Sequence, residues 1–168
     1  EVEHAIRHYI DLNIDDDPEL FASFAQMLEA ILQEFADNWN KIYEELEKLR
    51  RKMAAKEQEV TYGLDRKKQM PIFRRLHGLL YDNRTSSEDE IAQLVDLTQN
   101  AFILIDCEVR AVGFWDAISA QKHLEAELMA LFLSERFAGL PGMFGKHKEL
   151  ITRIMEWARK EHQTIVRE

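Results

Sequence analysis

Apolar residues between Phe21 and Met53 recur in alternating steps of four and three, a spacing typical of a helix that packs along another helix. One register holds Phe21, Leu28, Phe35, Ile42 and Leu49, and the other holds Leu32, Trp39, Leu46 and Met53. We predict one coiled-coil-like helix over 18–56, on the order of 55 to 60 Å long, with a kink near Asp37 and Asn38 as an alternative. Such a helix needs a partner helix, either from this chain or from another subunit.

Start and stop signals divide the remaining sequence into about five further helices. The predicted ranges are 2–12, 71–80, 87–109, 114–135 and 146–165, and Asp17 with Pro18 marks the start of the long helix. Ser87 and Glu90 form a capping box, while Gly113 and the turn 139–145 separate the later helices. No stretch alternates convincingly with period two. The sequence therefore predicts an all-α helical bundle that forms a single domain over 1–168.

Composition excludes several other classes of protein. Of 168 residues, 46% are hydrophobic and 32% charged, with 6 Gly and 3 Pro, which favours helices over a disordered chain. A single cysteine, Cys107, cannot form an internal disulfide, so we expect a reducing, cytoplasmic compartment. The apolar runs are too short to cross a membrane. Because the sequence opens on Glu1 and Val2 with a helix already in progress, we expect a fragment from the interior or the end of a larger multidomain protein.

Motifs that resemble catalytic or metal sites are each better explained by structure. The glycines of 139–147 lie near Lys146, but a phosphate-binding loop needs shorter spacing and a hydroxyl where His147 stands. His4 and His8 share a helical face, and Glu1 with His4 matches half of a di-iron motif, but no second ligand pair is visible.

Two further candidates for chemistry are equally weak. The run 65–67, Asp-Arg-Lys, is placed in a loop, whereas the nuclease sites with such residues lie on strands. Cys107 has no neighbouring base and is expected to pack as a small hydrophobe. We therefore assign no catalytic, cofactor-binding or metal-binding residue.

Basic residues concentrate between Leu46 and Leu80, although the whole chain carries a net charge of −9. This segment has ten basic and four acidic residues, giving +6, so the remainder carries −15. A solvated helix face with pairs such as Glu44–Lys48 and Glu47–Arg51 would explain part of it. Contact with an acidic partner or with DNA phosphates is the functional alternative. The candidate contact residues are Lys48, Arg50, Arg51, Lys52, Arg66, Lys67, Lys68, Arg74 and Arg75.

An ordered series of segments resembles the C-terminal helical region of the motor (R) subunit of type I restriction enzymes. The resemblance covers 8–13, 17–18, 21–32, 39–49, 63–64 and 71–76, with a looser match at 113–115 and in the final helix. It implies a parent protein that translocates and cleaves DNA with ATP and Mg²⁺, through domains that would lie upstream of this chain. It also implies that this region joins the motor to the methyltransferase and specificity subunits.

The leading hypothesis is therefore a protein-docking domain, with Phe21, Phe35, Trp39, Ile42 and Leu46 in the core and seam. One alternative is DNA-backbone binding through the basic stretch 48–75, and another is a homodimeric coiled-coil scaffold. No cofactor is expected within this chain, and no membrane contact.

Overall fold

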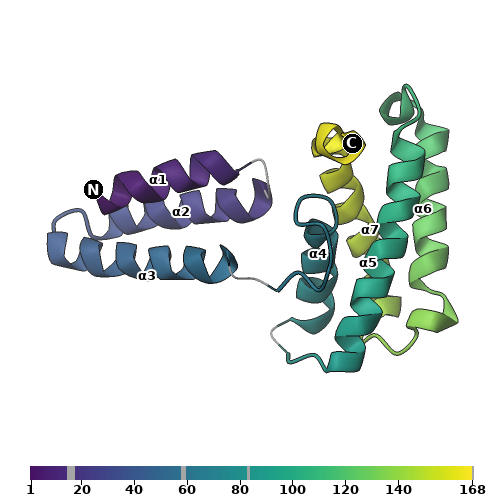
Figure 1. Ribbon diagram of the computed structural model, residues 1–168, viewed down its shortest axis with the longest axis horizontal. Helices are drawn as coiled ribbons and strands as arrows, with labels where there is room; N and C mark the ends of the chain where they lie inside the picture. Colours follow the sequence, from purple (N-terminus) through teal and green to yellow (C-terminus); the bar gives the residue numbers. More distant parts are fainter. Residues whose placement is uncertain (15–17, 58–59, 83, 168) are drawn as a thin grey trace. The chain divides into compact units, whose positions relative to one another are not determined.

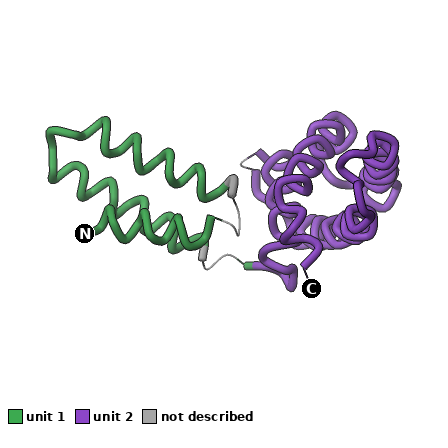
Figure 2. Tube along the Cα trace, turned by 90° about the horizontal axis from the view of Figure 1, so that it is seen from above, with its two compact units in different colours: residues 1–60 green, residues 61–168 purple. Residues whose placement is uncertain are grey.

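The computed structural model describes residues 1–14, 18–57, 60–82 and 84–167, and all regular structure in these ranges is helical (Figure 1). The all-α prediction is confirmed. The chain divides into two compact units, unit 1 over 1–60 and unit 2 over 61–168 (Figure 2). No helix in the described ranges has the length and apolar character that a bilayer crossing requires.

In its described residues, 1–14, 18–57 and 60, unit 1 is a bundle of three helices, α1 (Val2–Asn13), α2 (Pro18–Glu34) and α3 (Trp39–Glu57). The helix α2 runs antiparallel to α1 and α3, which are therefore parallel to each other (Figure 1). Each of the three helices contacts the other two. Their buried side chains form one core: Ile6, Ile10, Phe21, Phe24, Leu28, Ile42, Leu46, Leu49 and Met53. The seam of 21–53 thus closes within the chain, with α1 as the third helix.

The prediction of one continuous helix over 18–56 was wrong. The helix α2 ends at Glu34, and the amide of Asn38 donates to the Phe35 carbonyl at 2.8 Å to close a tight turn. The Asn38 side chain then caps α3 by accepting from the Lys41 amide at 3.1 Å. This turn folds α3 back onto α2. The two halves of the apolar pattern consequently pack on each other, which removes the need for a partner rod.

Unit 2 contains four longer helices, α4 (Met70–Tyr81), α5 (Glu88–Val109), α6 (Ile118–Phe132) and α7 (Met143–Lys160). Short elements connect or follow them: η1 (Phe114–Asp116), η2 (Glu135–Phe137) and α8 (His162–Val166). α5 packs on α4 and α6, and α7 packs on the same two helices, so the four helices form a closed ring. Residues at 0% exposure, such as Leu94, Leu124 and Ile154, come from three of them and fill the centre.

Local signals in unit 2 behaved largely as predicted. Ser87 caps α5 by accepting from the Glu90 amide at 3.2 Å, and Pro71 lies in the first turn of α4. Gly113 and Gly142 adopt φ of 75° and 70° at the starts of η1 and α7, a region that favours glycine. In unit 1, Asp17, the predicted cap of the helix that starts at Pro18, lies outside the described residues.

Two predicted ranges in unit 2 were only partly right. The range 114–135 is broken, because η1 ends at Asp116 and the extended Ala117 precedes α6. Ile118, expected on the apolar stripe, is 70% exposed as the first residue of that helix. The last predicted helix begins three residues earlier than expected and ends at Lys160, where a turn leads into α8.

Candidate functional site

The start of α3 presents two aromatic side chains to solvent. Trp39 is 79% exposed and Tyr43 is 58% exposed, and their separation of four residues places them on the same face of the helix. The prediction that Trp39 belongs to the core was wrong. Trp39 is the first residue of α3, whereas Ile42 and Leu46 lie farther along the same helix and are buried.

A groove of about 390 Å³ lies beside these aromatic rings, between the start of α1 and the start of α3. Four apolar residues, Val2, Leu32, Ile42 and Leu46, line it together with Trp39 and Tyr43. Glu1 and Glu3 complete the lining. This end of unit 1 therefore combines an apolar surface with carboxylates at its edge.

A second groove, of about 240 Å³, lies farther along the same two helices. It is lined from α1 by Ala5, Ile6 and Tyr9 and from α3 by Arg50, Met53 and Ala54. Since both grooves follow the line where α1 and α3 run side by side, we refer to them together as the α1–α3 groove. It extends over 1–9 of the first helix and 39–54 of the third.

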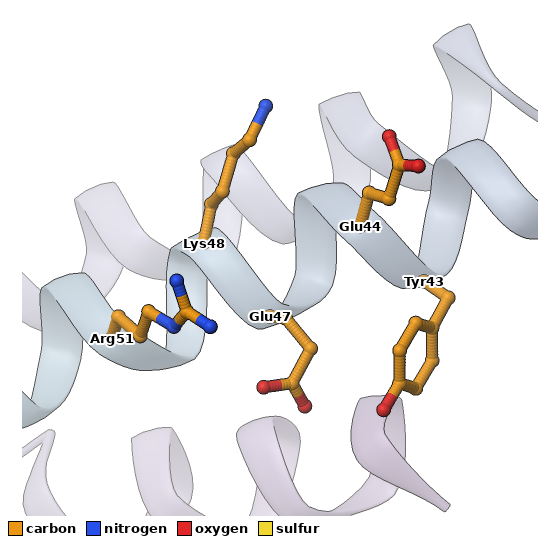
Figure 3. Close-up of a pocket in the computed structure, with 5 residues that line it drawn as sticks. All are labelled: Tyr43, Glu44, Glu47, Lys48 and Arg51. Carbon is orange, nitrogen blue, oxygen red and sulfur yellow. The ribbon is translucent and has the colours of Figure 1, made fainter.

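A third concavity, about 380 Å³ in volume, lies on the exposed side of α3 and is mostly charged (Figure 3). It is lined by Tyr43, Glu44, Glu47, Lys48 and Arg51. In Figure 3, Tyr43 and Glu47 extend to one side of the helix, while Glu44 and Lys48 extend to the other. Tyr43 thus belongs both to this concavity and to the α1–α3 groove.

Acidic neighbours neutralise several basic residues on α3. Lys48 Nζ lies 2.7 Å from a Glu45 carboxylate oxygen, and this bond lowers the pKa of Glu45. Arg50 contacts Glu47 at 3.0 Å. These pairs have spacing of three residues, whereas the sequence suggested Glu44–Lys48 and Glu47–Arg51. Lys52 extends to the Met27 sulfur at 3.7 Å and so partly covers α2.

The remaining predicted contact residues, Arg66, Lys67, Lys68, Arg74 and Arg75, belong to unit 2. Asp65 accepts from the amides of Lys67 and Lys68 at 2.8 and 2.7 Å, which forms the turn before α4. The Lys68 ammonium donates to the Arg167 carbonyl. The Arg75 guanidinium donates to the Pro71 carbonyl and lies 6.0 Å from the ring centre of Trp157. The basic stretch is therefore divided between two units and part of it stabilises unit 2.

Other sequence candidates also have structural explanations. Lys146 and His147 lie within α7, where Lys146 Nζ donates to the Leu79 carbonyl at 2.6 Å and so links α7 to α4. Within the described ranges, no three His, Cys, Asp or Glu residues converge as metal ligands would, and this includes His4 and His8. Cys107 is exposed, contrary to the expectation that it would pack in the core.

Sequence reasoning missed the α1–α3 groove, because it treated 18–56 as one rod and left the short helix 2–12 without a partner. A usable signal was present: Asn38 precedes a new helix in the same way as Ser87 does, and Trp39 directly follows it. Recognition of this cap would have placed Trp39 in the first turn of a new helix. The assignment of Trp39 to the core would then not have followed from the heptad pattern of 21–35.

Comparisons with known proteins give no assignment. No protein family model, curated protein or solved structure matches this chain.

Proposed function

We propose that this chain is a protein-docking module and that the α1–α3 groove, with Trp39 and Tyr43 at its edge, contacts the partner. The observation that carries the proposal is the 79% exposure of Trp39 beside an apolar groove. Tryptophan and tyrosine are enriched among the residues that dominate protein interfaces, since a large ring buries much area at little entropic cost. A largely exposed Trp next to an apolar groove can therefore anchor a partner.

The resemblance to the R subunit of type I restriction enzymes suggests the partner. On that basis we propose docking to the methyltransferase and specificity subunits in the cytoplasm. ATP-dependent DNA translocation and cleavage would belong to other parts of the parent protein. The groove supports docking to a protein, and the resemblance supports the choice of the methyltransferase and specificity subunits as that protein.

DNA-backbone binding through 48–75 is the weaker candidate. Its support is the local charge of +6, but Lys48 and Arg50 already contact carboxylates, and Lys68 contacts the chain itself. A homodimeric scaffold is also disfavoured. Unit 1 contains 15 acidic and 7 basic residues, a net charge of −8, so two copies would repel each other.

The test is a pull-down of the methyltransferase and specificity subunits encoded beside the parent gene, with a DNA mobility-shift assay at near-physiological salt. We expect the full chain to capture these proteins without shifting DNA. Trp39→Ser should reduce capture about tenfold, as expected for a central aromatic contact. Phe144→Ser is the matched control, because Phe144 is 82% exposed but lies on unit 2. A DNA shift without protein capture, or equal capture by both variants, would refute the proposal.

A further inference from the structure

We infer that the occupant of the α1–α3 groove is a single amphipathic helix of the partner, apolar on one face and basic along its edges, which adds a fourth helix to unit 1. This inference rests on the docking function proposed above and specifies the chemistry of the partner. It is carried by the shape, the lining and the charge of the groove.

The shape of the groove fits a helix. α1 and α3 are parallel and adjacent, and the two grooves lie one after the other along them, lined at 1–9 on one side and at 39–54 on the other. At 1.5 Å per residue the lining spans about 13 Å along α1 and about 24 Å along α3, so a helix of about 16 residues would cover the longer side. Four-helix bundles are built by placing such a helix against two neighbours.

An extended peptide would fit less well at this place. Along the groove, the backbone N–H and C=O groups of α1 and α3 are used within the helices, and unit 1 offers no strand edge among its described residues. A strand docked here would leave its own backbone groups unpaired against an apolar surface, which costs free energy. A helix satisfies these groups internally. Helix-in-groove binding is therefore favoured over strand addition.

The lining of the groove requires an apolar face on the incoming helix. The half-buried Val2 and Leu32 line one end, and the half-buried Tyr9 and the exposed Ala54 line the other. The other apolar residues of the lining belong to the core of unit 1 and are only 2–6% exposed: Ile6, Ile42, Leu46 and Met53. Tyr43 and Trp39 stand exposed at the edge and could close over a docked side chain. Apolar residues at positions i, i+3, i+4 and i+7 of the incoming helix would face this surface.

The charge around the groove favours basic edges on that helix. Glu1 and Glu3 belong to its lining. The Arg7 guanidinium lies 3.0 Å from a Glu3 carboxylate oxygen and 2.6 Å from one of Glu29, so these three side chains together keep a net negative charge. Arg50, the basic residue in the lining, is paired with Glu47. The net charge of −8 on unit 1 adds a long-range preference for a basic partner and against a second copy of this chain.

The experiment is selection from a displayed library of helical sequences on the immobilised full chain. Each member has about 16 residues, matched to the groove length, with leucine at i, i+3, i+4 and i+7 and with flanking positions drawn from Lys, Glu and Ser. We expect enrichment of lysine at the flanking positions. Binding of the enriched sequences should fall by about tenfold or more in Ala54→Trp, which fills the groove, and in Trp39→Ser, which removes the anchor.

Ala30→Trp is the matched control, since Ala30 is an exposed alanine of α2 that does not line the groove. It should leave binding unchanged, because it adds the same ring elsewhere on unit 1. Enrichment of glutamate, a pool that binds no better than the starting library, or equal loss in the two tryptophan variants would overturn the inference. Partner capture that depends on Trp39 but not on Ala54→Trp would leave the docking function standing and reject the helix alone.

Discussion

Trp39 illustrates how the environment of one residue can depend on its position within a helix. In an uninterrupted heptad it would share the seam with Leu46, which is 4% exposed. Both residues lie on the same face of α3, but Trp39 is its first residue, whereas Leu46 lies two turns farther along. Ile42, Leu46, Leu49 and Met53 satisfy this packing, and Trp39 at the helix start falls outside it. Trp39 therefore remains exposed to solvent at the end of its helix.

Glu90 provides a test at the residue scale. Its pKa is lowered by the Tyr81 hydroxyl and by Ser87, which it also contacts in the capping box at 3.2 Å. A carboxyl with a lowered pKa in the folded state stabilises the protein above the pKa of the unfolded chain, and this contribution is lost as pH falls through the folded value. We expect Glu90→Gln to lower the thermal midpoint at pH 7.

The difference between Glu90→Gln and the wild type should shrink as the pH is lowered below 4.5, the ordinary value for glutamate. Thermal unfolding followed by circular dichroism between pH 7 and pH 3 measures it. Glu88→Gln is the control: Glu88 is exposed and lies in the same first turn, so it reports the general effect of negative charge at the start of α5. Equal losses in both variants would show that Tyr81 and Ser87 are not involved.

At the scale of the element, the turn between α2 and α3 determines the fold of unit 1. It contains neither glycine nor proline. It depends on the Asn38 side-chain cap and on the hydrogen bond from the Asn38 amide to the Phe35 carbonyl. We expect Asn38→Ala to destabilise unit 1 by about 1 kcal/mol, the usual cost of losing a side-chain cap. Asn40→Ala is the matched control, because Asn40 is the exposed second residue of α3 and its side chain does not cap the helix.

Urea unfolding of the two variants, followed by circular dichroism, measures this difference. A lower midpoint for Asn38→Ala than for Asn40→Ala is the expected result, since only the first removes an acceptor for the Lys41 amide. If the two midpoints coincide, tertiary packing between α2 and α3 alone determines where α3 begins.

Helix boundaries could be predicted from sequence where the chain has strong local signals. Pro71, the Ser87–Glu90 box and Gly113 each marked a boundary that the structure confirms. The break at 35–38 was named only as a kink, because an asparagine cap inside an unbroken apolar repeat is a weak signal. The α1–α3 groove depends on this break and on packing between distant segments. Neither its lining nor the exposure of Trp39 followed from periodicity.

At the scale of the whole molecule, the described residues form two separate hydrophobic cores. The core of unit 1 uses residues from Ile6 to Met53, and that of unit 2 uses residues from Leu64 to Ile165. The sequence predicted one domain over 1–168, a size typical for single domains. Because each core is complete within its own unit, we expect each unit to unfold separately. Unit 1, with 60 residues, should be the less stable, since small domains bury a smaller fraction of their surface.

A fragment of 61–168 tests this expectation directly. It keeps Leu64, which is 4% exposed in the core of unit 2, and should unfold at the midpoint of the upper transition of the full chain. A fragment of 70–168 is the control: it loses the Leu64 contact and the Asp65 turn, and burial of one leucine stabilises by about 1.5–3 kcal/mol, so its midpoint should be lower. If 61–168 is unfolded while the full chain melts in one transition, the two cores are energetically coupled and the chain behaves as one domain. Separate transitions would instead show that each core folds and unfolds independently, as two complete cores predict.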